Sequence, residues 1–429
     1  MVVKRYLLPL YILLSVIILA GGYRSQIAVL DPRIEFPQQA DSRLYVITLV
    51  LYLIGFMFFI KAFISDRGLI SNIGTIFILP LVMMTTTIWS NFRAETFWAA
   101  AFYLSTVINC VASLYMWKLC GRQDFITYLL YMIISLSVFT VLMSPEIGVH
   151  QYTDAIQSSH AGEWRGIFGH RTSLGYVAAL CSIVSIRNYL YGSKRLVHFV
   201  FFGLSALSVF MANSAGGIIV FLISLSLLIF VLPITKLEKN LRIVIVLCAI
   251  TFFVVASTLF VLFYEEILEL FGKDSTFTGR VPYWRIILNT TDLNMLFGGG
   301  YKSGFIHIVL PKLQSVFPFT TIPNTQGGFI EAYVAGGLIG IAALSYFLIY
   351  LIFGFIDKVR CVYKIELNSK QKNIAMQEAM LYCGVAVMAT VNAIAEIDLF
   401  QPSNPILPLV IFGICNPPNL QGPADNTVR

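Results

Sequence analysis

The sequence predicts an all-α membrane protein that crosses the bilayer about twelve times. Hydrophobic residues make up 58% of the 429 positions and charged residues only 12%, whereas a soluble chain carries about 25% charged residues. Mean hydropathy is +0.80. Many apolar runs approach the roughly 20 residues that a helix needs to cross a hydrocarbon core about 30 Å thick. These runs lack the alternation of a membrane β-barrel, so the spans are predicted to be helices.

The predicted spans follow one another closely, and one long polar segment interrupts them. This segment, residues 264–326, lies between the ninth and tenth spans and contains aromatic residues, glycines and a helical pattern, so we expect it to be ordered. Residues 1–415 are predicted to form a single membrane domain, and the proline-containing polar tail 416–429 is expected to be disordered. The spans are predicted at residues 6–22, 44–64, 69–89, 96–117, 124–144, 172–190, 196–212, 216–234, 241–263, 327–356, 374–395 and 405–415.

The distribution of charge predicts the orientation. With twelve spans and the N-terminus inside, 18 of the 29 Lys and Arg residues and only 7 of the 22 Asp and Glu residues fall in inside segments. An excess of Lys and Arg marks the cytoplasmic side of a membrane protein. Both termini are therefore expected in the cytoplasm, and the long segment 264–326 on the outer face.

Charge and cysteine usage also exclude some classes of ligand. The net charge of +7 is dispersed among the loops, so it indicates topology rather than nucleic-acid binding. The seven cysteines lie in or at the ends of apolar runs without metal-binding spacing, so they are expected to be packing residues. The predicted outer face shows neither an Asp-x-Asp pair nor a histidine cluster, so no metal is expected there.

The first polar cluster lies between the fifth and sixth predicted spans and reads EWRGIFGHRTSLG. Arg165 follows the interfacial residue Trp164 and precedes Gly166, and His170 and Arg171 follow at the start of the next predicted helix. An arginine can grip phosphate through two parallel hydrogen bonds, glycine allows close approach, and a helix N-terminus favours an anion. The alternative is that Arg165 only anchors the helix end among lipid headgroups.

The second cluster lies in the long outer segment. It reads FGKDSTFTGRVPYW, in which Arg280 follows Thr278 and a glycine and precedes a helix predicted to contain Trp284. Further along, Lys302 lies in the glycine-rich run GGGYKSGF and His307 follows it. A single glycine-rich run is weak evidence for phosphate binding. Two arginine–glycine clusters on the same predicted face are stronger evidence, and neither arginine is expected to hold helices together.

The third segment reads PNTQGGFIEAYVAGGLIG and leads into the tenth span. Gln326 precedes its first glycine pair, and Glu331 lies about one turn into the predicted helix. A carboxylate inside the membrane is a functional candidate, although it could instead pair with an arginine. Glu396 and Asp398, near the outer end of the eleventh span, leave the same two alternatives open.

Taken together, these segments resemble the O-antigen ligase and polysaccharide polymerase superfamily, especially its exopolysaccharide-polymerase branch. The spacing agrees over most of the chain, and the combination is more specific than any single motif. The matching positions are Trp89 and Ser90; the stretch 164–175, with Arg171 and Thr172 in the place of a Lys-Asn pair; Asn213 and Ser214; and Asp274, Thr276, Thr278, Gly279, Arg280 and Trp284.

The resemblance implies a metal-independent membrane glycosyltransferase without a cofactor. Its donor would be a polyprenyl-diphosphate-linked oligosaccharide, and it would join such units into an exopolysaccharide or O-antigen chain on the outer face of the bacterial inner membrane. A flippase and a chain-length regulator of the same pathway are the implied partners. The alternatives are a ligase that transfers the glycan to lipid A-core or protein, and a transporter or flippase of lipid-linked sugars.

The resemblance also assigns roles to individual residues. Arg165 and Arg280 would stabilise the leaving diphosphate. Gln326 stands where the family usually has a histidine, and because glutamine cannot accept a proton at neutral pH, His307 or His170 could substitute, or no base is required. The residues expected in the catalytic group are Arg165, Arg280, Gln326 and His307. The residues expected to bind substrate are Trp164, Gly166, His170, Arg171, Thr278, Trp284, Lys302 and Glu331.

Overall fold

The computed structural model describes residues 12, 42–66, 73–120, 124–152, 160–234, 280–317, 324–362, 368–402 and 404–415. This part of the chain forms helices joined by loops, with two isolated β-bridges and no named strand. Several predicted features lie outside the described residues. They are the first span apart from Ile12, the ninth span, the stretch 264–279, which includes Thr278, and the tail 416–429.

Each predicted span within the described residues coincides with a helix. The span predicted at 172–190, for example, is the helix Arg171–Tyr191. The elements are α3 (Ser42–Ser65), α5 (Ile73–Thr85), η2 (Thr86–Ile88), α6 (Arg93–Leu119), α7 (Phe125–Met143), α8 (Pro145–Gly148), α9 (Arg171–Tyr191), α10 (Arg195–Met211), α11 (Ala215–Ile234), α14 (Arg280–Leu288), η4 (Gly304–Val309), α15 (Leu310–Val316), α16 (Gly328–Val362), α17 (Ser369–Ala395), η5 (Asp398–Phe400) and α18 (Ile406–Cys415).

Several of these helices have the length and composition of membrane spans. Among the described residues, α6, α7, α16 and the stretch Gln371–Ala395 of α17 are long and apolar enough to cross a bilayer, and parts of α3, α5, α10, α11 and α18 are shorter apolar helices. Large apolar side chains such as Met57, Trp98 and Leu142 are exposed on the outside of the bundle, which suits contact with lipid. The protein is thus an all-helical membrane protein, and its number of crossings stays a prediction.

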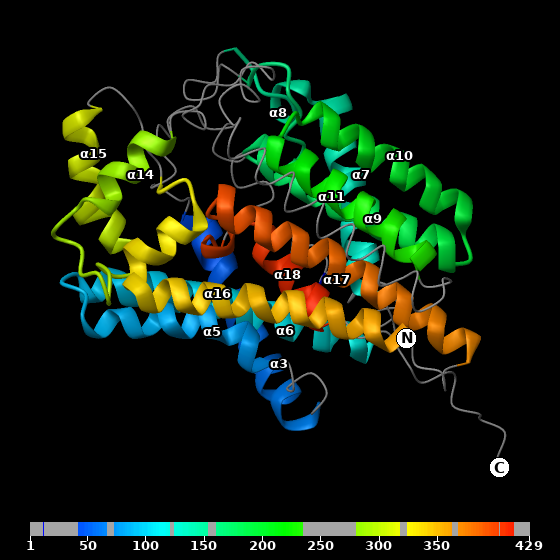
Figure 1. Ribbon diagram of the computed structural model, residues 1–429, viewed down its shortest axis with the longest axis horizontal. Coiled ribbons are helices and arrows are strands. Elements are labelled where there is room, and N and C mark those ends of the chain that lie inside the picture. The colour runs from blue at the N-terminus through cyan, green and yellow to red at the C-terminus, as the bar shows by residue number, and fades with distance from the viewer. Residues whose placement is uncertain are drawn as a thin grey trace.

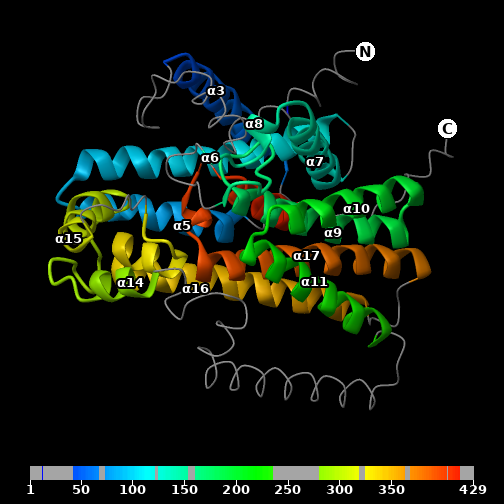
Figure 2. The ribbon, with the colours of Figure 1, turned by 90° about the horizontal axis from the view of Figure 1, so that it is seen from above.

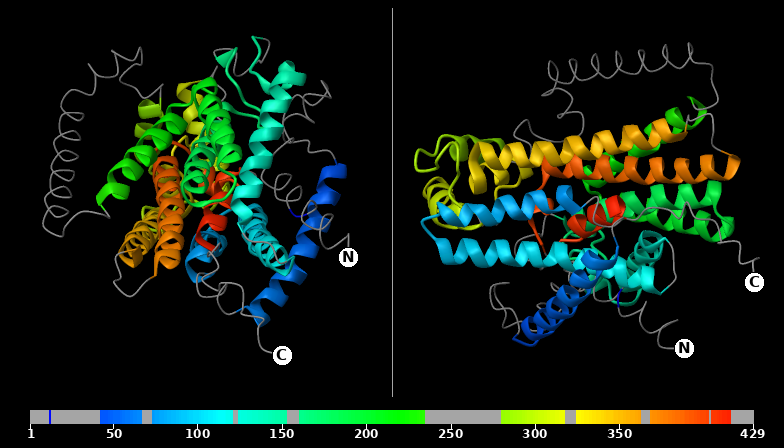
Figure 3. Two further views of the ribbon diagram at one scale, coloured as in Figure 1. Left: turned by 90° about the vertical axis from the view of Figure 1, so that its right-hand side faces the viewer. Right: turned by 90° about the horizontal axis from the view of Figure 1, so that it is seen from below.

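The long helices form a bundle, and the short outer helices gather at one end of it. Helices α16 and α17 lie side by side, and the axes of α5 and α6 are roughly aligned with this pair (Figures 1 and 2). The short helices α14 and α15 lie together at the end of α16 that begins at Gly328 (Figures 1 and 3). This end of the bundle therefore collects the segments that the sequence analysis assigns to the outer face.

The centre of the bundle holds α18, whose ten residues are all buried. At 10 residues it is too short to cross a bilayer alone, and it packs against α6, α17 and η5 instead. The turn before it is fixed by two buried tyrosines, because Tyr103 donates to the carbonyl oxygen of Leu399 at 2.7 Å and Tyr301 to that of Phe400 at 2.5 Å. These bonds hold the η5 turn, which carries Asp398, in one place.

Contacts at the helix ends agree with the predicted alternation of the loops. Lys118 pairs with Asp66 at 2.6 Å and joins two loops that the charge count places on the same side. At the opposite end, Trp89 Nε1 donates to the carbonyl oxygen of Phe297 at 2.6 Å and joins two loops predicted on the other side. Which of these two sides faces the cytoplasm stays a prediction.

Candidate active site

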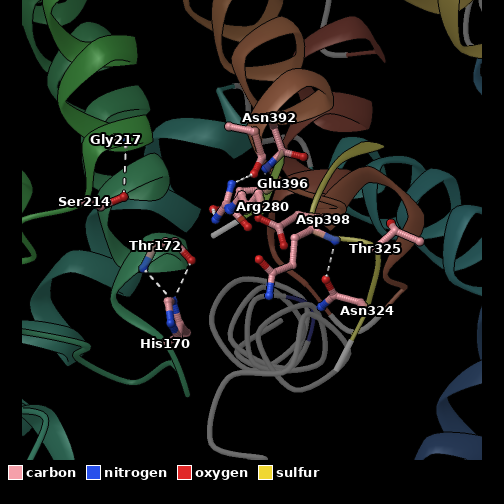
Figure 4. Close-up of polar contacts among 12 residues, drawn as sticks. His170, Thr172, Ser214, Gly217, Arg280, Asn324, Thr325, Asn392, Glu396 and Asp398 are labelled. Atoms are coloured by element: carbon pink, nitrogen blue, oxygen red, sulfur yellow. Dashed lines mark hydrogen bonds and ion pairs between the residues drawn. The ribbon is translucent and has the colours of Figure 1, made fainter. Parts of the chain in front are cut away.

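Arg280 and Glu396 form the centre of the polar cluster at the α14 end of the bundle (Figure 4). Arg280 is the first residue of α14, and its Nη2 donates to Glu396 Oε1 at 2.9 Å while its Nη1 donates to the carbonyl oxygen of Ala395. Because the last carbonyl groups of a helix lack internal partners and carry partial negative charge, the end of α17 favours a guanidinium. The two side chains are 24% and 21% exposed, respectively, so a ligand can reach this pair.

His170 caps the N-terminus of α9 on one side of this pair (Figure 4). The backbone N–H of Thr172 donates to His170 Nδ1 at 3.2 Å, so the neutral imidazole carries its proton on Nε2. Burial lowers the pKa of His170 to about 3, and the positive charges of Arg171 and Arg280 act in the same direction. His170 therefore remains neutral at physiological pH and offers Nε2 as a hydrogen-bond donor rather than as a base.

Three histidines gather beside this helix end. The ring centroids of His150, His160 and His170 lie 5.8 to 6.0 Å from one another. The sequence-based expectation that this face lacks a histidine cluster is therefore wrong, because a loop fold brings together residues ten positions apart. In the part of the chain that the structure describes, however, no group of three or more His, Cys, Asp or Glu side chains is arranged to hold a metal ion.

Arg171 is held by a second carboxylate. Its Nη1 donates to Glu163 Oε1 at 2.9 Å and to the carbonyl oxygen of Asn213 at 2.5 Å, and Asn213 Nδ2 donates to the same Glu163 oxygen at 2.8 Å. Arg171 also interacts electrostatically with Glu396. The starts of α9 and α14 therefore contribute two guanidinium groups to the region around Glu396.

The loop that carries Gln326 lies against Glu396 on the other side. Gln326 has a φ of 54°, a left-handed conformation that is strained for a non-glycine residue, and its backbone N–H donates to Asn324 Oδ1 at 2.8 Å. Trp284 Nε1 donates to the carbonyl oxygen of Thr325 at 2.9 Å. A Cβ added at Gly328 would lie 3.1 Å from the carbonyl oxygen of Glu396. Trp284 and this close approach place Gln326 beside the Arg280 pair.

Glu331 and Lys302 form an ion pair in the same region. Lys302 Nζ lies 3.1 Å from Glu331 Oε1, and Thr325 Oγ1 donates to Glu331 Oε2 at 2.9 Å. Glu331 is fully buried and paired. This pairing supports the alternative that Glu331 has a structural role, but its partner is a lysine and not the arginine considered from the sequence. Lys302 also has a left-handed φ of 62°, which requires a tightly held loop.

Arg165 is buried among backbone carbonyl groups. Its Nε donates to the carbonyl oxygen of Ile147 at 2.7 Å and its Nη2 to that of Glu146 at 3.2 Å. The expectation that neither arginine holds helices together is therefore wrong, because Arg165 ties its loop to α8 and Arg280 ties α14 to the end of α17. A Cβ added at the neighbouring Gly166 would lie 2.5 Å from Ser137 Cβ, so this glycine serves packing on α7. A role of Arg165 in phosphate binding stays a prediction.

The remaining predicted residues lie around these groups. Trp164 is half-buried, and its backbone N–H donates to the carbonyl oxygen of Met211 at 2.9 Å. His307 Nε2 lies 2.6 Å from Glu95 Oε2, and its ring stacks on Phe92 with centroids 3.9 Å apart. These contacts attach η4 to the start of α6. His307 is therefore paired with Glu95 and Phe92 and not with Arg280.

Two carboxylate partners of the arginines could not be recognised from the sequence. Glu163 lies eight positions before Arg171, a spacing that no regular structure brings together, so only the loop fold reveals this pair. Glu396 stood out in the sequence as a carboxylate next to an apolar run, but its partner Arg280 is 116 positions away. Nothing local in the sequence could identify that contact.

These features define a helical membrane protein in which one group of arginines and carboxylates, around Arg280 and Glu396, lies at the α14 end of the bundle. Comparisons with known proteins add a family. The O-antigen ligase family model matches residues 200–345. The chain is also 25% identical over 338 residues to the exopolysaccharide production protein ExoQ of Rhizobium meliloti (strain 1021), an alignment that covers 76% of this chain and 73% of that protein.

Both comparisons confirm the resemblance to the O-antigen ligase and polymerase-like family. At a coarse level they support a membrane protein of the polysaccharide ligase or polymerase type, and thus an enzyme of glycosyl transfer. The matched range includes Arg280, Gln326 and Glu331 and ends before Glu396. The contact of Arg280 with Glu396 therefore joins the matched range to a residue outside it.

Proposed function

We propose that the protein is a membrane glycosyltransferase that joins polyprenyl-diphosphate-linked oligosaccharide units into an exopolysaccharide or O-antigen chain. The observation that carries this proposal is the reachable guanidinium of Arg280, which lies between the start of α9, with Arg171, and the loop that carries Gln326. A guanidinium matches the geometry of a diphosphate and can bind it through two hydrogen bonds.

The reaction requires positive charge more than a strong nucleophile. An acceptor hydroxyl attacks the anomeric carbon of the donor while the lipid diphosphate leaves. Arg280 and Arg171 neutralise the charge that develops on the diphosphate, and His170 donates a hydrogen bond from Nε2. We propose that these groups, rather than a metal ion, stabilise the leaving group.

The location of the site suits a lipid-linked substrate. The polar cluster lies at the end of a bundle whose sides are apolar, so the polyprenyl chain can remain in the bilayer while the diphosphate reaches the arginines. We propose that this end faces away from the cytoplasm in the bacterial inner membrane. A flippase of the same pathway would then supply the donor, and a chain-length regulator would act on the growing product.

Reconstitution of the purified protein with a lipid-linked oligosaccharide donor tests the proposal. We expect products whose lengths are whole multiples of the donor unit, which identifies a polymerase. Transfer of one glycan to added lipid A-core, without multimers, would identify a ligase instead. Movement of intact donor across the bilayer with no new glycosidic bond would overturn the proposal in favour of a transporter.

A further inference from the structure

We propose that Glu396 accepts the proton of the acceptor hydroxyl, and that it becomes able to do so when the donor diphosphate displaces it from Arg280. This inference rests on the proposed function and names the base of the reaction. The observation that carries it is the position of Glu396, whose carboxylate is partly exposed and bonded to Arg280 and whose backbone lies against the start of α16.

Three segments distant in the sequence converge on Glu396. Arg280 reaches it from α14, and Arg171 interacts with it electrostatically from α9. The close approach of Gly328 to the carbonyl oxygen of Glu396 brings in the start of α16, two positions after Gln326. The start of α16, two positions after Gln326, therefore packs against the backbone of the residue that carries this carboxylate.

The other candidates for a base are less suitable. His170 uses Nδ1 to cap α9 and carries its proton on Nε2, and His307 is paired with Glu95. Asp398 is buried, and its Oδ2 accepts a hydrogen bond from Asn392 Nδ2 at 2.8 Å. An acceptor hydroxyl therefore reaches Asp398 less easily than Glu396, whose side chain is 21% exposed.

The ion pair couples the base to donor binding. In the structure the Arg280 guanidinium is partly occupied by Glu396. A diphosphate carries more negative charge than a carboxylate and can take both hydrogen bonds of the guanidinium fork. Its arrival frees the carboxylate, and a neighbouring negative charge favours proton uptake by a carboxyl group. The base is therefore released only when the leaving group is bound.

The step balances without any further reactant. The acceptor oxygen forms a bond to the anomeric carbon, and the bond from that carbon to the phosphate oxygen breaks. The electron pair of that bond leaves with the diphosphate, which Arg280 stabilises, and the hydroxyl proton moves to the Glu396 carboxylate. Solvent removes the proton before the next turnover.

The substitution Glu396→Gln distinguishes two possible roles of Glu396, as the base of the reaction or as a structural partner of Arg280. It keeps the size of the side chain but cannot accept a proton, so we expect chain extension to slow by about a hundredfold or more. It also removes the carboxylate that competes for Arg280, so binding of polyprenyl diphosphate should be at least as tight as in the wild type. A merely structural role predicts weaker binding together with slower turnover.

Two further variants complete the test. Glu396→Asp keeps a carboxylate and should retain more activity than Glu396→Gln. Asp357→Asn changes an exposed carboxylate on α16 that pairs with Arg360 and serves as the control with wild-type activity. Wild-type turnover in Glu396→Gln, or joint loss of turnover and polyprenyl-diphosphate binding, would overturn the inference while leaving an active wild-type enzyme. Absence of chain extension by the wild type would instead overturn the proposed function.

Discussion

Substitution of Arg280 distinguishes a role of this arginine in catalysis from a role in holding α14 against α17. Arg280 makes two hydrogen bonds to the end of α17, one to the Glu396 carboxylate at 2.9 Å and one to the carbonyl oxygen of Ala395. Loss of a contact that stabilises transition-state charge costs about 3 to 4 kcal/mol, or roughly a hundredfold to a thousandfold in rate. Loss of a hydrogen bond between charged groups costs about 1.5 to 3 kcal/mol of folding free energy.

We therefore expect Arg280→Ala to slow chain extension per folded molecule by at least about a hundredfold and to lower the melting temperature in detergent. Arg280→Lys keeps the charge without the bidentate fork, so its rate should lie between those of Arg280→Ala and the wild type. Arg285→Ala alters an exposed arginine on the same helix and serves as the control for both measurements. Wild-type turnover per folded molecule in Arg280→Ala would show that this arginine only ties α14 to α17, and would refute the reasoning.

Three further predictions address the pH dependence, the glutamine and the topology. The pKa of His170 is about 3 in the folded state and about 6.5 when unfolded, so unfolding takes up a proton and the stability should fall as the pH drops from 6.5 towards 3, by up to about 1.4 kcal/mol per unit. His170→Asn keeps a capping acceptor and should flatten this part of the melting-temperature curve, whereas an unchanged slope would contradict the assignment. Gln326→His should keep or raise the rate of chain extension and Gln326→Leu should lower it, because the position requires a polar contact; equal rates for Gln326→Leu and the wild type would identify simple packing. Ser315→Cys, at an exposed position on α15, should react with an impermeant thiol reagent in cells with a permeabilised outer membrane, and labelling only after lysis of the inner membrane would reverse the predicted orientation.

Much of the fold could be predicted because a bilayer constrains the sequence so strongly. A span must be apolar along its whole length, so its limits are visible locally, as in the predicted span 96–117 and the observed helix Arg93–Leu119. The position of α18 could not be predicted in this way. Its composition matches that of a lipid-exposed helix, and only the surrounding helices determine that all ten of its residues are buried.

The candidate site could be predicted only in part, because the sequence shows residue types but not which distant loops meet. The types of residue indicated which side chains suit a diphosphate, and the structure brings Arg280, Trp284 and Gln326 into one neighbourhood. The carboxylate partners of the arginines were not predictable, because they depend on which loops meet at the end of the bundle. Arg165 shows the opposite case, since a motif position that suggested a ligand contact also bonds two backbone carbonyl groups.

The most direct test of the central claim is the release of polyprenyl diphosphate from a lipid-linked oligosaccharide donor by the purified protein in the presence of EDTA. Arginine-based transfer predicts one molecule of polyprenyl diphosphate for each glycosidic bond formed, and a rate at least about a hundredfold lower for Arg280→Ala. Undiminished donor after incubation with folded wild-type protein, or release that EDTA abolishes, would contradict an arginine-based transfer from a diphosphate-linked donor.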